Sequence, residues 1–180
     1  STLFPYTTLF RSRSKIEDCH VTGSIKGSSG NVGGIIGAAA SSSLITEDSH
    51  VKDCTFSGSV TGSEYVGGIV GSIAFSSKTY CYTIENCTVT STMIQSQYQN
   101  IGGIVGGLSI YAATTVVKDC KVAQTTVTPG SGTARGAIMG NSLSTTQVNG
   151  CIYQSADPNL KGIGDNSDEG CTRVYNINAG

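Results

Sequence analysis

The sequence predicts an all-β fold: a right-handed parallel β-solenoid of about four to five coils, with about 33 residues per coil. The first observation is a glycine-rich hexapeptide that recurs about every 34 residues, closing at Gly37, Gly71, Gly106 and Gly140. Its copies are Val32–Gly37, Val66–Gly71, Ile101–Gly106 and the degenerate Arg135–Gly140. The glycines that repeat are Gly33, Gly34, Gly37, Gly67, Gly68, Gly71, Gly102, Gly103, Gly106, Gly136 and Gly140.

The second observation is a short motif ending in cysteine, which keeps nearly the same period. Its copies are Ile16–Cys19, Val51–Cys54, Ile84–Cys87, Val117–Cys120 and Val148–Cys151. The cysteines recur about every 33 residues, and the spacing is shortest before Cys151. Two motifs that recur in phase indicate stacked repeats, each forming one coil of a solenoid.

Columns of equivalent residues support in-register stacking. The column Glu17, Lys52, Glu85, Lys118 alternates in charge. Stacking would therefore place opposite charges on neighbouring rungs, each pair contributing roughly 0.2–1 kcal/mol. The next column is Asp18, Asp53, Asn86 and Asp119, which are residue types that tolerate turn geometry.

Alternating polarity after each cysteine is the third observation, and it predicts a strand with one buried face. In the second unit Cys54, Phe56 and Val60 would point inward, and Thr55, Ser57 and Ser59 outward. The equivalent inward residues elsewhere are Cys19, Val21 and Ile25, and Cys87, Val89 and Met93. About three short strands are expected per coil, and the usual crossover preference predicts the right hand.

Composition excludes several classes of function. The 180 residues carry a net charge of −1, which gives no basic surface for nucleic acid. No apolar run approaches the 18 or more residues of a membrane span. We therefore expect no binding to nucleic acid and no membrane span in this stretch of chain.

Three segments are predicted. Residues 2–12 resemble a translated sequencing adapter, so residues 1–13 are expected to be a non-native or disordered leader of a metagenomic fragment. Residues 14–155 should form the solenoid repeats. Residues 156–180 should form a degenerate last coil or a loop-rich tail.

The repeated cysteines Cys19, Cys54, Cys87, Cys120 and Cys151 are predicted to form a buried thiol column that packs as small apolar groups. They lack the short paired spacing of metal sites. Cys81 and Cys171 are expected to lie off this column. Bridges Cys151–Cys171 or Cys81–Cys87 are open alternatives in an oxidising compartment.

The remaining candidates favour structural roles. The glycine hexapeptides lack the following helix and Lys-Ser or Lys-Thr pair of a phosphate loop. His20 is assigned to a solvated outward column with Thr55 and Thr88. Residues 165–169 could offer oxygen ligands to a cation but lack known calcium spacings, so a polar loop is preferred. We therefore predict no catalytic, cofactor-binding or metal-binding residues.

Outward hydroxyl columns form a flat surface that could bind ice or sugar, or could simply keep an exposed sheet soluble. They include Ser57 and Ser59, Thr88 and Thr90, and Thr125, Thr126 and Thr128. Tyr65, Tyr98 and Tyr111 are expected at turns or edges, where their rings could stack on sugars.

The hexapeptide pattern resembles the GLUG-motif repeat family over roughly residues 14–155, with isoleucine where the family name implies leucine. The resemblance implies a non-catalytic stalk or adhesion module of a secreted or cell-surface bacterial protein. Its partners would be a glycan or host surface protein, and neighbouring repeats of the same chain. The alternatives are a β-helical polysaccharide lyase or hydrolase and an ice-binding solenoid, although Lys121 and Ala123 interrupt the threonine face that the latter needs.

Overall fold

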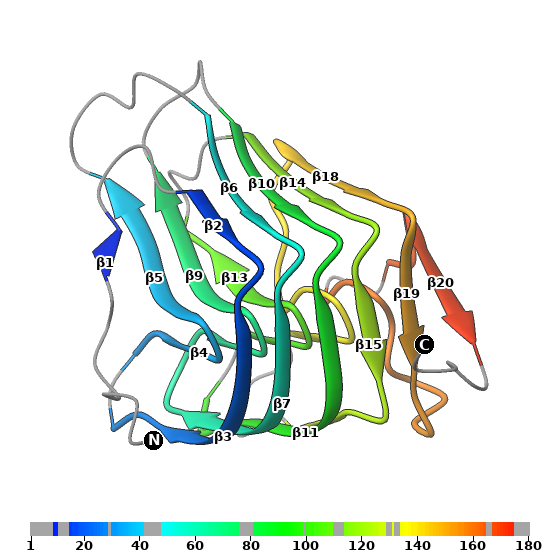
Figure 1. Cartoon of the computed structure of the whole chain (residues 1–180). Helices are drawn as coiled ribbons and strands as arrows, with labels where there is room; N and C mark the ends of the chain where they lie inside the picture. Colours follow the sequence, from blue (N-terminus) through cyan, green and yellow to red (C-terminus); the bar gives the residue numbers. More distant parts are fainter. Residues whose placement is uncertain are drawn as a thin grey trace.

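The computed structural model describes residues 9–10, 15–28, 30–41, 48–75, 81–98, 100–109, 114–128, 131, 134–164 and 167–174. None of these residues lies in a helix. All strand pairs between named strands are parallel, and they assemble into four sheets that wind around one interior (Figure 1). The predicted parallel β-solenoid is therefore confirmed, whereas its right hand and its number of coils stay predictions.

Two sheets meet at the cysteine motif. The marker sheet contains, in spatial order, β18 (Thr146–Asn149), β14 (Thr114–Lys118), β10 (Cys81–Glu85), β6 (Ser49–Lys52) and β2 (Lys15–Glu17). The long sheet contains β20 (Cys171–Val174), β19 (Cys151–Gln154), β15 (Lys121–Ala123), β11 (Thr88–Ser96), β7 (Thr55–Gly62) and β3 (His20–Lys26), with β16 (Thr126–Thr128) also paired to β11. Figure 1 shows the bend that joins each marker-sheet strand to the long-sheet strand after it.

The glycine hexapeptides build the other two sheets. The short sheet contains β17 (Arg135–Gly136), β12 (Ile101–Gly102), β8 (Val66–Gly67) and β4 (Val32–Gly33). The closing sheet contains β1 (Leu9–Phe10), β5 (Ile36–Ser41), β9 (Val70–Phe75) and β13 (Val105–Leu108). Each of the first three hexapeptides thus supplies one short strand, a bend, and the start of the next strand, whereas the fourth supplies β17 and an isolated bridge at Met139. The two residues of β1 fall inside the predicted leader, whose boundary stays a prediction.

Equivalent residues of successive coils lie on one another, as the columns predicted. Glu17 is the direct partner of Lys52. The Ile35 and Ile36 amides both donate to the Ile69 carbonyl, at 3.1 and 3.0 Å. The coils therefore repeat in register at the spacing of neighbouring strands, about 4.8 Å.

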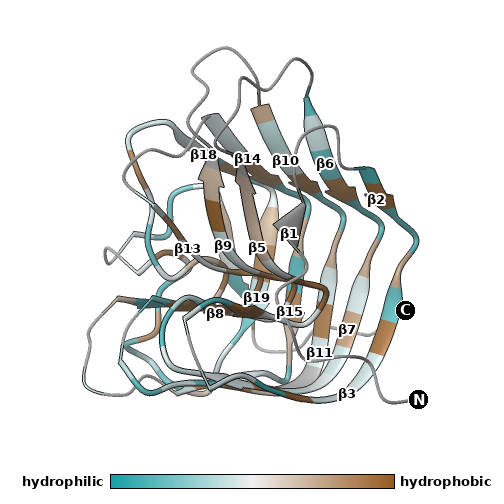
Figure 2. Cartoon of the chain, turned by 90° about the vertical axis from the view of Figure 1, so that its left-hand side faces the viewer, coloured by the Kyte–Doolittle hydropathy of each residue, from teal (hydrophilic) through white to brown (hydrophobic). Residues whose placement is uncertain are grey.

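The interior is a stack of apolar columns, visible as brown bands at the same place on neighbouring strands (Figure 2). The marker sheet contributes Val51, Ile84 and Val117, all fully buried. The long sheet contributes the in-register column Phe56, Val89, Val122 and Tyr153, at most 1% exposed. The bends of the hexapeptides contribute Ile69, Ile104 and Ile138, also fully buried. Burial of these columns is the main stabilising term for each coil.

Two predictions about side-chain direction were wrong. Met93 is 48% exposed, and Ile94 is buried in its place. The pairing of β11 with β7 shifts register between Thr90 and Met93, a bulge that reverses the alternation beyond it. Thr125 is buried and donates to the Ala123 carbonyl, because Gln124 before it has φ 53° and interrupts the strand.

Candidate functional site

A left-handed corner joins the marker sheet to the long sheet in every coil. Asp18, Asp53, Asn86 and Asp119 have φ of 52°, 54°, 51° and 54°, as the turn-tolerant column predicted. Asp and Asn are, after glycine, the residues that adopt this conformation most readily. The Asn86 amide also donates to the Asp53 carboxylate at 2.6 Å, which links two rungs along the outside of the corner.

The corner column continues through Gly150 of the fifth predicted copy, which has φ 63°. Beyond the predicted copies, Gly170 has φ 71°. Residues 168–171 thus form a sixth copy of the motif, which the sequence reasoning missed because it follows the fifth at much less than the usual spacing. Its first position is also polar, so the apolar-first pattern does not detect it. The shared Gly-Cys ending of 150–151 and 170–171 is the signal that would have found it.

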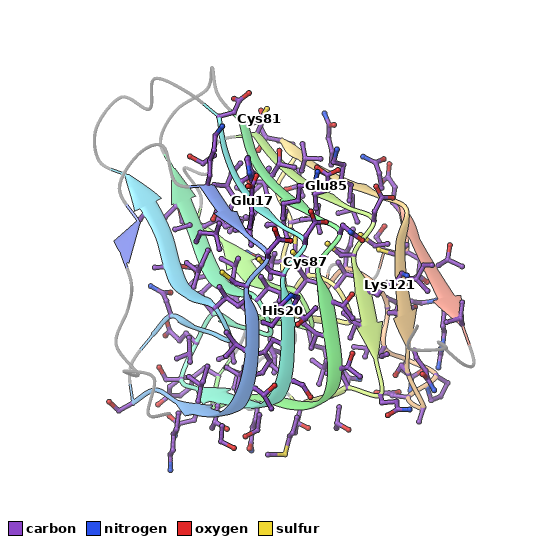
Figure 3. The ribbon with its side chains drawn as sticks, viewed as in Figure 1. Glu17, His20, Cys81, Glu85, Cys87 and Lys121 are labelled. Carbon is purple, nitrogen blue, oxygen red and sulfur yellow. The ribbon has the colours of Figure 1, made fainter. Side chains whose placement is uncertain are left out.

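The thiol ladder lies just inside the corner. It contains Cys19, Cys54, Cys87, Cys120 and Cys151, as placed by the sequence, and the last four are fully buried. Cys171 is the direct partner of Cys151, so the prediction that it lies off the ladder was wrong. Cys81 lies elsewhere, on β10 opposite Thr114 (Figure 3). All seven cysteines are free thiols.

Most ladder thiols are hydrogen-bonded to the backbone. The Cys54 thiol donates to the Lys52 carbonyl at 3.1 Å, and the Cys87 thiol to the Glu85 carbonyl at 3.3 Å. Burial raises the pKa of the Cys54 thiol to about 12, with smaller contributions from neighbouring cysteines. Cys54 is therefore a protonated thiol at neutral pH, and it packs in the core as a small apolar group.

The alternating charged column is present, but only part of it forms ion pairs in the described residues. Lys118 Nζ lies 3.2 Å from Glu85 Oε2. Glu17 Oε1 is instead 2.6 Å from His50 Nε2 on the neighbouring strand, a contact that sequence reasoning did not foresee. His20 is exposed in the outward column, as predicted, with Nδ1 2.8 Å from Thr55 Oγ1. These contacts join side chains of neighbouring rungs.

The outer face of the long sheet carries aligned hydroxyl groups. Thr22, Ser57 and Thr90 are direct partners along the stack, and so are Ser24 and Ser59. The Ser59 hydroxyl donates to Ser24 Oγ at 2.9 Å. Successive hydroxyls on this face are thus about one strand spacing apart, about 4.8 Å. Lys121 extends the Thr55–Thr88 column with a charged group.

The predicted tyrosines differ in availability. Tyr98 is 52% exposed after β11 and is free to contact a ligand. Tyr65 is half-buried, and its ring would lie 3.1 Å from a Cβ on Gly107, so it packs against the hexapeptide of the next coil. Tyr111 lies outside the described residues.

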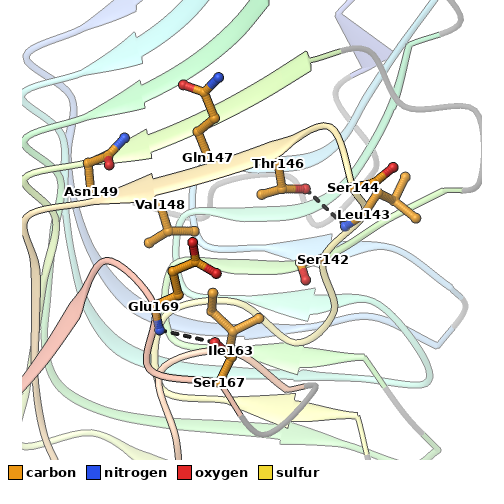
Figure 4. Close-up of a pocket in the computed structure, with 10 residues that line it drawn as sticks. All are labelled: Ser142, Leu143, Ser144, Thr146, Gln147, Val148, Asn149, Ile163, Ser167 and Glu169. Carbon is orange, nitrogen blue, oxygen red and sulfur yellow. Dashed lines mark hydrogen bonds between the residues drawn. The ribbon is translucent and has the colours of Figure 1, made fainter.

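A polar groove of about 510 Å³ lies where the marker sheet ends at β18 (Figure 4). Its lining is Ser142, Leu143, Ser144, Thr146, Gln147, Val148, Asn149, Ile163, Ser167 and Glu169. Within it the Leu143 amide donates to Thr146 Oγ1 at 3.0 Å, and the Glu169 amide donates to Ser167 Oγ at 3.1 Å. The groove exists because the sixth motif supplies a corner but no described strand beside β18.

The predicted polar loop at 165–169 is anchored through Asp168, whereas Asp165 and Asn166 lie outside the described residues. Asp168 Oδ1 accepts from the Tyr153 hydroxyl at 2.8 Å and from the Gly162 amide at 2.7 Å. Its Oδ2 lies 3.2 Å from Lys161 Nζ. Partial burial opposes the charge of Asp168, but these hydrogen bonds outweigh it and lower the pKa of the carboxyl. Among described residues, no group of three or more His, Cys, Asp and Glu could hold a metal ion.

The glycine hexapeptides act through close backbone contact. A Cβ on Gly67 would lie 2.0 Å from the Val70 carbonyl oxygen and 2.6 Å from the Gly106 amide. A strand, and not a helix, follows each bend that the structure describes from β4 to β13. The hexapeptide is therefore a tight corner between two sheets.

These features define the class: a repeat protein whose coils stack through aligned corners, thiols and glycine bends. Within that class, the model of the GLUG motif matches residues 28–61, which include the first hexapeptide and most of the strand β7. This match agrees with the resemblance that the hexapeptides indicated, and it covers the first of them. No curated protein and no solved structure shows significant similarity to the chain. The described residues include no helix long and apolar enough to cross a membrane.

Proposed function

We propose that the chain is a non-catalytic repeat module of a secreted or cell-surface bacterial protein, and that it acts as a stalk or adhesive surface. Its ligand would be a glycan or a protein that lies flat against the outer face of the long sheet. The GLUG motif and the solenoid support a repeat module of this kind.

The observation that carries the proposal is the outward hydroxyl array of β3, β7 and β11. Thr22, Ser57 and Thr90 stand on three neighbouring strands in direct register. Hydroxyl groups both donate and accept hydrogen bonds, so a regular array suits a repeating polar ligand such as a polysaccharide. The exposed ring of Tyr98 at the end of β11 would add a stacking platform.

The test is a binding screen against glycans and extracellular host proteins, followed by two matched variants. S57K/T88K places two bulky cations on the proposed face, on side chains that point outward from β7 and β11. Q147K adds a cation to the exposed position of β18 on the marker sheet. We expect S57K/T88K to weaken binding at least tenfold and Q147K to leave it unchanged.

Two results would contradict the proposal. One is the absence of any ligand for the folded chain in the screen, and the other is equal binding by S57K/T88K and the unaltered chain. Loss of binding when the carboxylates of Asp168 and Glu169 are removed would move the site to the groove beside β18.

The two other candidate functions have their own readouts. A lyase or hydrolase would shorten a polysaccharide on incubation with the purified chain, and the groove beside β18 with Glu169 is where its site would lie. An ice-binding solenoid would show thermal hysteresis. The charged Lys121 in register with Thr88 argues against the latter, because it interrupts the flat hydroxyl column.

A further inference from the structure

The last pair of the thiol ladder differs from the rungs before it. Cys171 is half-buried, whereas its partner Cys151 is fully buried. The Cys151 thiol donates to the Asn149 and Val117 carbonyls, both at 3.6 Å. Of the six ladder thiols, Cys171 alone has no hydrogen bond to another described residue. It is therefore the thiol most available for new chemistry.

The backbone of Gly162 packs against Cys171. A Cβ on Gly162 would lie only 2.6 Å from the Cys171 sulfur, so only glycine fits at this position. The access of solvent to Cys171 therefore rests on its half-buried position at the end of the ladder. Asp168 is the nearby carboxylate, and it is already paired with Lys161.

Stacking geometry fixes what the two sulfurs can bind. Cys151 and Cys171 are direct partners on parallel strands, so their backbones lie about 4.8 Å apart and their side chains extend in the same direction. A disulfide would need the sulfurs to approach to about 2.05 Å. A cation held between two sulfurs in a straight line needs them about 4.6 Å apart, which is twice a metal–thiolate bond of about 2.3 Å. The rung spacing matches the second arrangement without movement of the backbone.

Ligand number and charge narrow the choice of cation. Zinc takes four ligands, and no described group of three or more donors lies here. Thiolates select soft metals. Two thiolates and one divalent cation sum to zero charge, which suits a site at the margin of an apolar core. A monovalent cation would leave one uncompensated negative charge.

We propose that Cys151 and Cys171 bind a soft divalent cation of two-coordinate preference, with mercuric ion as the test case, in a linear bridge between their sulfurs. Each thiol loses its proton to solvent as one metal–sulfur bond forms, so two protons are released for each cation bound. No oxidant or reductant takes part.

The test uses the full reduced chain carrying C19S and C81S, which removes the two half-buried thiols outside the pair. One equivalent of mercuric chloride is added, and X-ray absorption and thermal unfolding are measured. We expect two sulfur neighbours at about 2.3 Å and an unfolding midpoint raised by about 5 °C or more, because a bound cation stabilises the folded state.

The matched variant adds C171S, and C171A is the alternative if the serine variant does not give the unaltered circular-dichroism spectrum. We expect both effects to be lost in it. Retention of two-sulfur coordination and of the raised midpoint without Cys171 would overturn the proposal. So would a midpoint that falls, or stays the same, when mercury binds the chain that keeps both cysteines.

Discussion

The regular coils and the last coil share the left-handed corner beside the cysteine, but they differ in the strands that connect one corner to the next. The segment from Cys54 to Cys87 supplies strands to all four sheets, namely β7, β8, β9 and β10. In the described residues, the shorter segment from Cys151 to Cys171 supplies β19 and then, without a further named strand before β20, isolated bridges from Ile163 to Met139 and Ser167 and backbone hydrogen bonds to the preceding coil. The corner and its cysteine are thus retained in the shorter repeat, and the difference in length lies in the segments between the corners.

The two regions are also held by different forces. In the regular coils fully buried isoleucines and valines fill the interior. In the last coil a polar clasp formed by Tyr153, Asp168 and Lys161 is added to the buried Leu160 and Ile163. Arg173 extends this clasp by donating to the carbonyls of Ser155 and Asp157 at 2.9 and 2.8 Å. We therefore expect core substitutions to unfold the whole chain and clasp substitutions to loosen only its end.

The largest effect should come from I69D in a regular coil. Ile69 is fully buried, and an unpaired carboxylate there costs several kcal/mol, comparable with the total stability of a domain. We expect no cooperative thermal transition by circular dichroism. I35D is the control, because the equivalent Ile35 of the first coil is only half-buried. Equal melting of I69D and the unaltered chain would refute the assignment of this column to the core.

G67A should be the next most damaging change. Its Cβ would meet backbone atoms of Val70 and Gly106, which cannot rotate away, so we expect a loss of about 1–3 kcal/mol or more. G30A is the control, since a Cβ on Gly30 has no neighbour within 4 Å. Denaturant unfolding of the two variants measures the difference. If they match, the hexapeptide glycines are not required by close packing.

Substitutions at Asn86, which has φ 51°, test whether the corner needs the left-handed backbone conformation. Both N86V and N86G lose the hydrogen bond to Asp53, but only valine is strained in the left-handed conformation. We expect N86V to be less stable than N86G by about 1–2 kcal/mol. Chemical denaturation of the pair gives this difference directly, and a more stable valine variant would contradict the corner geometry.

The smallest effect should appear in the polar clasp. The pKa of Asp168 is lowered below its ordinary value of 3.8, so its stabilising contribution is present above that value and disappears as the pH falls through the folded-state pKa. We expect D168N to cost roughly 1 kcal/mol at pH 7, after allowing for solvent screening of this partly exposed group. The difference between the two proteins should shrink below about pH 4.

Thermal unfolding across pH 3–7 measures this effect, with E169Q as the neighbouring control. A constant difference between D168N and the unaltered chain at every pH would show that the charge of Asp168 plays no part in the clasp.

The sequence alone predicts the regular coils well because each coil requires the same types of residue at the same positions. Glycines that allow close backbone contact, Asp or Asn at a left-handed corner, and a small apolar thiol inside it recur at a nearly fixed spacing. The positions of Gly67 in a tight bend, Asn86 at a corner and Cys87 inside it can therefore be predicted without knowledge of contacts between distant residues.

What the sequence does not predict depends on the partner strand or on the end of the stack. Met93 faces outward because β11 carries extra residues opposite Gly58, which becomes visible only when the two strands are paired. The contact of His50 with Glu17 joins neighbouring strands through side chains of different columns. The sixth copy of the cysteine motif, at residues 168–171, was not predicted because its first position is polar and it follows the fifth copy at a short spacing.

The corner column also bears on how such a chain can change in length. Every corner presents the same backbone conformation to the corner above and below it, so the joints between coils are interchangeable. Excision or duplication of a segment running from one corner to the next would reconnect equivalent joints and leave each remaining side chain with a partner of the same kind. A gene encoding this protein could therefore lengthen or shorten by unequal recombination, one whole coil at a time, without any compensating change elsewhere.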